Sequence, residues 1–438
     1  MGTLGTVIGV ILLLSYVAFA IYAAKGGNLM LGFFVMAILW AGLGCIAGLT
    51  TWTTTAKNAI DINNGIFEQG PELWGTTAVI IIFGSWFGRV LVETGIASTV
   101  IRKSVELGGD RPVITCILLS IVTSLIFTSA YGAGAVVAIG VIVFPILLSL
   151  GIPKPLATAS FLMSVGAGLY FNMGWFKQVA ALIPDFPYDT KYQIFATICF
   201  ALQMVFTCLM ISLSLRKKKP SHAWAAPAVP TETKNVNGLA MLTPVLPVVM
   251  AIFFKFQPIT AILFAVLWAL LFTGNLRNWN RLGELVQKTF HDGVADIGLV
   301  FAFLFFLQMF LRSAKVCAPL LAPILKPIMP QNLFFLFLVF GILAILALFR
   351  GPLTLWGAGA ATLAMFQAMN VYPASILFPL FLVPSTTVNG SICPTQSWCL
   401  WAIGYTKTTV KDYLRQVLAY ALIPAFIMEI VAYFIFAA

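Results

Sequence analysis

The sequence predicts an all-α polytopic membrane protein with two inverted-topology repeats, each containing a re-entrant helical hairpin and a broken helix. Three observations predict this fold: a very apolar composition, apolar runs of membrane-spanning length, and a constant spacing between similar segments of the two halves. Hydrophobic residues make up 61% of the 438 residues and charged residues only 9%, whereas about 25% of a typical soluble domain is charged. This composition argues against a soluble enzyme, a nucleic-acid-binding protein and a disordered chain.

The apolar runs have the length and character of membrane-spanning α-helices, which need about 20 apolar residues. The first run, 3–24, has no positive charge before it, so we interpret it as a retained span rather than a signal peptide. Later runs continue to 416–437, and several are interrupted by glycine, proline or polar residues. These runs do not alternate apolar and polar residues as the strands of a transmembrane β-barrel do.

The longest polar stretch, 216–238, contains four consecutive cations and three prolines. We interpret it as a linker between a first transmembrane half, 1–215, and a second, 239–438. The positive-inside rule puts this linker in the cytoplasm, and threading the other loops from it gives about ten crossings with both termini outside. We therefore expect an integral membrane protein of the inner, or cytoplasmic, membrane of a bacterium.

The two halves match at a nearly constant offset. Residues 67–75 resemble residues 290–298, and Gly-Ala-Gly-Ala at 132–135 recurs 225 residues later at 357–360. Because the chain between the copies crosses the membrane an odd number of times in this threading, the repeats point in opposite directions. Inverted repeats are typical of secondary transporters, which bind substrate at the repeat interface. The residues matched at an offset of 223 are Phe67 and Phe290, Gly70 and Gly293, Gly75 and Gly298, Phe87 and Phe310, and Arg89 and Arg312.

Each Gly-Ala-Gly-Ala segment lies between two apolar runs and follows small polar residues. Glycine permits a tight reversal of the chain, and non-helical backbone at membrane depth occurs only where protein buries it or where it lines a cavity. We therefore predict re-entrant hairpins at 111–150 and 332–370. The alternative is that each is a pair of complete spans with glycine-rich packing faces.

A broken helix is predicted after each hairpin, at 155–180 and at 373–400. Within the second, residues 384–398 combine two prolines and a glycine with a dense group of hydroxyl and amide side chains. A helix interrupted in this way leaves backbone groups unpaired, so its helical ends favour anions or cations. The alternative for this polar stretch is a loop at the membrane surface.

This succession of a hairpin, a small-residue tip and a broken helix in each half, with Pro145 in the returning arm of the first hairpin, resembles the ion transporter superfamily. That group includes divalent-anion:sodium symporters, citrate transporters and gluconate permeases. The segment 83–109, FGSWFGRVLVETGIASTVIRKSVELGG, is similar to a pattern of gluconate permeases and citrate transporters. The resemblance covers most of 50–400, and it implies an elevator-type mechanism and a homodimer.

Arg350 is the most informative candidate site residue, because it falls at the predicted tip of the second hairpin. A charge at the bilayer centre costs about 2.5–3.5 kcal/mol on insertion scales, and a guanidinium group matches a carboxylate in a bidentate geometry. Arg350 is therefore expected to contact an anionic substrate, unless it pairs with a structural carboxylate or reaches the membrane surface. The other candidate substrate-binding residues are polar side chains at the predicted tips and breaks: Thr128, Ser129, Asn172, Thr354, Thr387, Asn389, Thr395 and Gln396.

The coupling ion is either sodium or a proton. Hydroxyl and carbonyl groups at Ser129, Gly132 and Asn172 would suit sodium, whereas Asp296 and Glu93 are candidates for proton binding. Glu429 is isolated within the last apolar run, where it could face a partner. No metal centre, catalytic residue or cofactor other than a sodium ion is predicted.

The sequence therefore predicts a secondary active transporter of a small organic anion, with a carboxylate as the first expectation. Its partners would be this anion, the lipid bilayer and a second copy of the chain, with no nucleic acid. The alternative function is a cation/proton antiporter of the same superfamily. An intramembrane enzyme is disfavoured because HExxH and GxSxG motifs and paired membrane aspartates are missing from the sequence.

Overall fold

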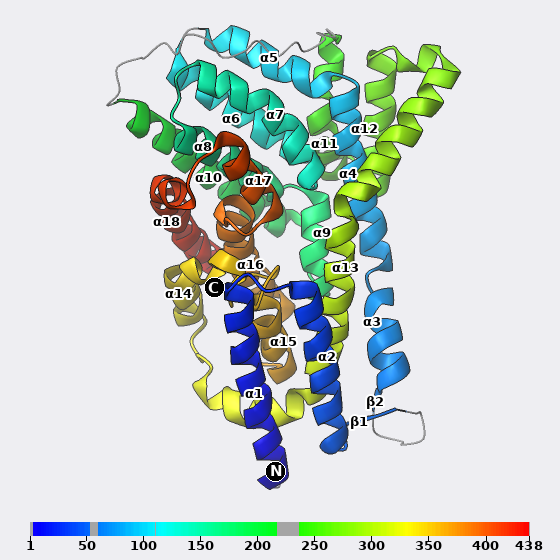
Figure 1. Ribbon diagram of the computed structural model, residues 1–438, viewed down its shortest axis with the longest axis vertical. Helices are drawn as coiled ribbons and strands as arrows, with labels where there is room; N and C mark the ends of the chain where they lie inside the picture. The colour runs from blue at the N-terminus through cyan, green and yellow to red at the C-terminus, as the bar shows by residue number, and fades with distance from the viewer. Residues whose placement is uncertain (1–2, 53–59, 110, 217–235, 438) are drawn as a thin grey trace.

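The computed structural model describes residues 3–52, 60–109, 111–216 and 236–437 (Figure 1). These residues are helical apart from turns and one pair of parallel two-residue strands, β1 (Thr50–Thr51) and β2 (Ile60–Asp61). Most of the predicted linker, 217–235, lies outside the described residues. The helices of the first half are α1 (Thr3–Ala24), α2 (Leu29–Ile46), α3 (Gln69–Glu72), α4 (Gly75–Glu93), α5 (Ile96–Gly108), α6 (Pro112–Phe127), α7 (Ala133–Ser149), α8 (Lys154–Leu169), α9 (Met173–Leu182) and α10 (Thr190–Arg216).

The second half is also helical, and its α13 runs along most of the vertical axis in Figure 1. The α1–α2 pair lies toward the lower end of this view, and α5, α6 and α7 lie toward the upper end. The helices of this half are α11 (Leu246–Phe253), α12 (Pro258–Phe272), α13 (Trp279–Leu325), α14 (Leu333–Ile342), α15 (Gly359–Met369), α16 (Ala374–Val383), α17 (Ser397–Thr406) and α18 (Val410–Phe436). Short 3₁₀ and π segments lie between the helices of both halves. The first half has η1 (Ile62–Glu68), and the second half has η2 (Gly238–Val245), η3 (Asn275–Arg277), η4 (Lys326–Ile328), η5 (Leu343–Arg350) and η6 (Pro384–Gly390).

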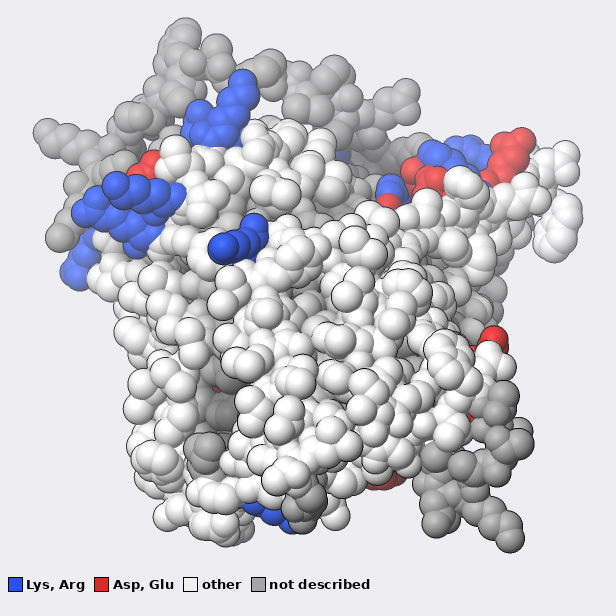
Figure 2. Space-filling view, turned by 60° about the horizontal axis from the view of Figure 1, so that its bottom comes forward, with Lys and Arg blue, Asp and Glu red and all other residues white. Residues whose placement is uncertain are grey.

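The described chain contains seven helices that are long and apolar enough to cross a membrane, or eight if the bent α8–α9 pair counts as one span. The protein is therefore an integral membrane protein. This number is lower than the roughly ten crossings expected from the positive-inside threading, because proline and glycine divide several apolar runs into helices of 10–17 residues. Figure 2 shows charged side chains mostly toward the rims of one face, with a broad uncharged surface between them.

Two helical pairs occupy the segments predicted as hairpins. In the first half, α6 begins with Pro112, whose missing N–H costs nothing at the first helical position. A turn at 128–132 then leads to α7, and Gly132 has φ +101°, a conformation that requires glycine. In the second half, α14 and η5 lead into α15 through residues 351–358. Helical geometry ends at Leu348 and Phe349, so the chain reverses close to Arg350.

The structure also contains an interruption in each of the two segments predicted as broken helices. Helices α8 and α9 are bent by 66° at a short break, within the predicted segment 155–180. In the other half, α16 passes into the π-helical segment η6, and α17 begins only at Ser397. Pro384 and Pro394 lie at this second interruption, where each removes a backbone hydrogen-bond donor.

The first half packs against α13 through two reciprocal glycine contacts. A Cβ atom at Gly70 of α3 would lie 3.2 Å from the backbone of Met309, and one at Gly293 would lie 2.9 Å from the backbone of Trp86. Gly293 follows Gly70 by 223 residues, and Met309 follows Trp86 by the same number. In each half, therefore, the glycine at this repeat position contacts the residue of the other half that occupies the second repeat position. The Ser85 hydroxyl also donates a hydrogen bond of 2.8 Å to the Gly293 carbonyl.

Candidate functional site

A cavity of about 570 Å³ lies where both predicted hairpins and both broken helices meet. The first half contributes Tyr131 from the α6–α7 turn and two residues of α9. The second half contributes Arg350, Trp356 and the residues 394–398 that lead into α17. The α1–α2 turn and one face of α13 complete the lining. Four elements that are far apart in the sequence therefore converge on one cavity, which we define as the central cavity.

Four aromatic side chains of the central cavity form two pairs related by the repeat offset. Trp398 follows Trp175 by 223 residues, and Trp356 follows Tyr131 by 225. The Trp175 ring is central, with its centroid 5.0 Å from that of Trp356, 6.2 Å from that of Tyr131 and 6.5 Å from that of Trp398. Aromatic surfaces of this kind bind the apolar part of a ligand.

The polar groups of the central cavity favour negative charge. Arg350 is half-buried, and its Nη2 donates a hydrogen bond of 3.1 Å to the Thr395 carbonyl. Asp and Glu are missing from the described lining, and the described ion pairs do not include Arg350. The buried Trp356 Nε1 donor has no partner among the described residues, and α17 starts with Ser397 at the edge of the cavity, where its helix dipole is positive.

Arg350 lies in a strained turn, and a close approach of two chain segments holds this turn in place. Phe349 and Arg350 both have positive φ, at 52° and 60°, a conformation that is unfavourable for side chains other than glycine and is found preferentially at functional sites. The Arg350 carbonyl accepts a hydrogen bond of 2.9 Å from the Ala358 N–H. Gly357 packs so closely on Arg350 that a Cβ atom would overlap the Arg350 carbonyl. The second Gly-Ala-Gly-Ala segment thus permits this turn.

The two broken helices contact each other directly beside the cavity. The Trp175 indole donates a hydrogen bond of 2.9 Å to the Thr386 hydroxyl, and the Tyr170 and Thr387 hydroxyls are 2.6 Å apart. Thr387 also donates to the Gln203 amide oxygen, at 3.1 Å. The break between α8 and α9 and the π-helical segment η6 are therefore linked by hydrogen bonds.

Three of the candidate substrate-binding residues line the central cavity: Arg350, Thr395 and Gln396. Four others lie near the cavity, in neighbouring turns or in η6, and have partners within the protein. The Thr128 hydroxyl donates to the Leu125 carbonyl at 2.7 Å. The buried Thr354 hydroxyl accepts a hydrogen bond of 3.4 Å from the Trp356 N–H. Thr387 belongs to the contact between the broken helices, and the buried Asn389 donates to the Ala347 carbonyl at 3.4 Å.

Asn172 links the break in the first half to the turn of the first predicted hairpin. Its Nδ2 donates to the carbonyls of Phe127, at 3.0 Å, and Ala130, at 2.9 Å. Its Oδ1 accepts a hydrogen bond of 3.1 Å from the Trp175 N–H and so caps α9. The Ser129 hydroxyl is buried in the same turn without a partner among the described residues.

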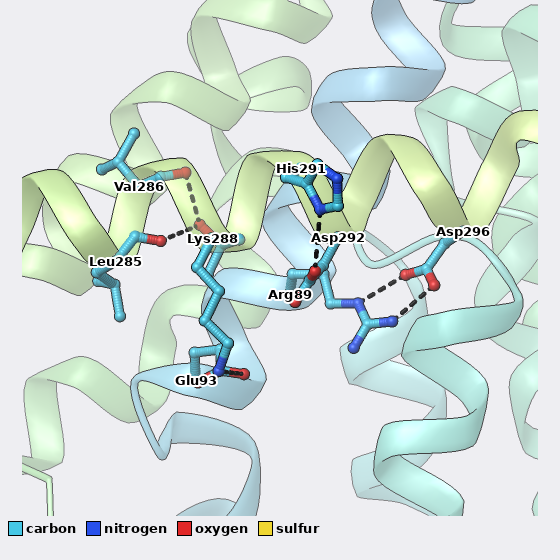
Figure 3. Close-up of polar contacts among 9 residues, drawn as sticks. Arg89, Glu93, Leu285, Val286, Lys288, His291, Asp292 and Asp296 are labelled. Atoms are coloured by element: carbon cyan, nitrogen blue, oxygen red, sulfur yellow. Dashed lines mark hydrogen bonds and ion pairs between the residues drawn. The ribbon is translucent and has the colours of Figure 1, made fainter.

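Asp296 lies outside the central cavity, in an ion pair with Arg89 (Figure 3). The Arg89 Nε donates to one carboxylate oxygen and Nη2 to the other, both at 2.6 Å. The carboxylate also lies against Gly134 near the start of α7, where a Cβ atom would overlap it. Gly132 lies beside Ser85 of α4, whose hydroxyl would be 3.4 Å from a Cβ atom there. These two candidate coupling residues thus belong to the contact of α7 with α4 and α13.

Sequence reasoning did not select several residues of the central cavity. A usable signal was present, because the repeat offset that relates Arg89 to Arg312 also relates Trp175 to Trp398. Gln178, which accepts a hydrogen bond of 3.2 Å from Tyr131, has no such signal. The lining residues not selected include Tyr131, Trp175, Gln178, Trp356, Ser397 and Trp398.

A second cavity, of about 740 Å³, lies between α9, α13 and the α15–α16 turn. Its lining includes Arg312, which corresponds to Arg89 in the other half, and the exposed Lys315. The buried Arg312 Nε has no partner among the described residues. Of these two cavities, the central cavity is the one that joins both broken helices to Arg350, so we take it as the candidate site.

Comparisons with known proteins agree with an integral membrane protein and indicate a transporter fold. No family model matches the sequence, and no curated protein matches it either. The structure is similar to the crystal structure of the YdaH transporter of Alcanivorax borkumensis, with a TM-score of 0.60 and 16% sequence identity. The match covers 92% of this chain and 97% of YdaH. The protein thus has the fold of a membrane transporter.

Proposed function

We propose that the protein is a secondary active transporter of a small organic carboxylate, which binds in the central cavity. The observation that carries this proposal is Arg350, which lies without an acidic partner among the described residues in a cavity contributed by both halves. A cation held in an apolar surrounding is stabilised by an anion. The alternative, a cation/proton antiporter, would need a carboxylate facing the cavity, and the described lining has none.

The cavity chemistry favours a monocarboxylate with an apolar or flat body. Arg350 offers a bidentate contact for one carboxylate, and Trp356 Nε1 and the start of α17 supply further donors. Since Arg350 is the single charged residue in the described lining, a second or third carboxylate would lack a cation. Trp175, Trp398 and Tyr131 offer aromatic surface to the rest of the molecule.

We further propose that the same arrangement provides alternating access. The reciprocal contacts of Gly70 with Met309 and of Gly293 with Trp86 support two halves of inverted topology. In our proposal α4 and α13 form a scaffold, and the hairpins and broken helices carry the substrate past it in an elevator-type motion. Gly134 of α7, which lies against Asp296 without a side chain, would allow this sliding. A homodimer, which the resemblance to the ion transporter superfamily implies, would anchor the scaffold in the membrane.

The direct test is uptake by purified protein in liposomes. Labelled mono-, di- and tricarboxylates are supplied with a sodium gradient, a proton gradient or neither, and empty liposomes serve as the control. We expect saturable, gradient-driven uptake that prefers monocarboxylates. Absence of carboxylate uptake under every gradient, or uptake of cations in exchange for protons, would contradict the proposal.

A further inference from the structure

A second ionisable side chain, Glu429 of α18, is completely buried within the chain, with 0% of its surface exposed. The sequence alone suggested that it could face a partner, but α18 turns this side chain inward. Ala425, Met428 and Ala432, which share its helical face, are also fully buried. Neither oxygen of the Glu429 carboxyl group has a hydrogen-bond partner among the described residues.

The described residues around Glu429 offer no compensating charge. Its Cβ lies 3.4 Å from the position that a Cβ atom at Gly341 of α14 would take. Two ionisable groups of the described residues lie near it, Tyr170, beside the break of α8, and Cys199 of α10, and both are neutral in their ordinary form. The other packed segments, α14, α16 and η6, contain no ionisable residue. Arg350, at the end of η5, lines the central cavity instead.

An unpaired carboxylate in such surroundings is costly, so the protonated acid is the favoured form in this conformation. Burying an isolated charge costs several kcal/mol or more, and ionisable residues inside membrane spans are retained mainly where they act on ions or protons. A neutral apolar residue would fill the same space without this cost. A specific role for the carboxyl group therefore explains its presence better than packing does.

Glu429 is also adjacent to the contact between the two broken helices. The neighbouring residue, Met428, accepts hydrogen bonds of 3.4 Å at its sulfur from the hydroxyls of Tyr170 and Thr387. These two hydroxyls join the break of α8 and α9 to η6. Trp175 lines the central cavity and donates a hydrogen bond to Thr386, the residue before Thr387. Only a few residues therefore separate the Tyr170–Thr387 contact from the candidate site.

We propose that Glu429 is the proton-binding residue that couples anion transport to a proton gradient. The inference rests on the proposed function, and it selects the proton over sodium as the coupling ion. The carboxylate takes a proton from water on one side of the membrane, carries it in the buried state described above, and releases it to water on the other side. One proton and one monocarboxylate move together as an electroneutral pair.

The first experiment measures net uptake and exchange in liposomes for the wild type and for Glu429→Gln. We expect Glu429→Gln to lose proton-driven net uptake while it still exchanges internal for external anion, because the neutral amide imitates the protonated acid. The matched control is Glu106→Gln, since Glu106 lies on the exposed face of α5 with a half-exposed side chain. Proton-driven uptake that survives Glu429→Gln would overturn the inference, and so would wild-type uptake driven by sodium alone. Loss of both activities in a variant that still binds the anion would also overturn it.

The second experiment detects the proton without transport. At neutral pH, the infrared C=O band of a protonated carboxylic acid should be present in the wild type and in Glu106→Gln, and it should be lost in Glu429→Gln. A band that is unchanged in Glu429→Gln would overturn the inference. A wild type that carries no anion would count against the proposed function, while this band would still report whether Glu429 holds a proton.

Discussion

Arg89 of α4 and Asp296 of α13 form a bidentate ion pair that lies directly against Gly134 of α7. The pair does not follow the repeat, because the position equivalent to Asp296 in the first half is Leu73. It joins the two helices that we propose as the scaffold at the place where a predicted hairpin meets them. Both side chains are mostly buried, with exposed fractions of 24% and 13%.

Neutralising one member of this pair should destabilise the protein more than neutralising both. Arg89→Gln leaves a carboxylate without its partner, and Asp296→Asn leaves a guanidinium, whereas the double variant leaves no charge. We expect a coupling free energy of roughly 1–3 kcal/mol from thermal unfolding of the single and double variants. The matched control is Lys288–Glu93, a more exposed pair between the same helices, with exposed fractions of 59% and 29%. Additive effects at Arg89 and Asp296 would show that the pair does not act as a unit.

Gly134→Ala should lower both thermal stability and transport, because its Cβ atom would overlap the Asp296 carboxylate. The control is Gly283→Ala in α13, where no atom lies within 4 Å of the added Cβ. Alanine is favoured over glycine in a helix by about 1 kcal/mol, so the control should be neutral or slightly stabilised. Equal stability of the two variants would contradict the close approach of α7 to Asp296.

Asn172→Ala should destabilise the first hairpin turn, because the carbonyls of Phe127 and Ala130 lose their donor. Each buried group left without a partner costs about 1–3 kcal/mol. Asn332→Ala is the matched control, since Asn332 caps α14 through the same kind of bond but is exposed. Thermal unfolding should show a much larger loss for Asn172→Ala. Similar losses would mean that Asn172 acts only as a helix cap.

Trp356→Phe should weaken carboxylate binding while the aromatic surface of the cavity is largely kept. The variant removes the buried Nε1 donor that has no partner among the described residues. A neutral hydrogen bond contributes about 0.5–1.5 kcal/mol, so the dissociation constant should rise by roughly two- to tenfold. Trp268→Phe, which removes a donor to the Leu239 carbonyl away from the cavity, should leave binding unchanged. An unchanged affinity in Trp356→Phe would remove this donor from the site.

The sequence predicted the helical segments well, because hydrophobicity, glycine and proline act locally. Residues 3–24 form α1, and the predicted break within 155–180 is the bend between α8 and α9. The use of each polar side chain was less predictable. Asn172 and Thr387 are the residue types that bind substrates, yet both bond to neighbouring segments whose positions depend on tertiary packing. The inward direction of Glu429 likewise depends on the rotation of α18, which the apolar residues on both sides of Glu429 do not reveal.

The most direct test of the central claim is calorimetric titration of the purified protein with monocarboxylates and their neutral amides. Three proteins are compared: the wild type, Arg350→Gln, and Arg312→Gln as the matched control for another half-buried arginine. A hydrogen bond to a charged group contributes about 1.5–3 kcal/mol, so Arg350→Gln should weaken carboxylate binding by roughly 10- to 100-fold, while Arg312→Gln binds as the wild type does. Carboxylate binding that is indifferent to Arg350→Gln, or equal binding of the neutral amides, would contradict an anion site at Arg350.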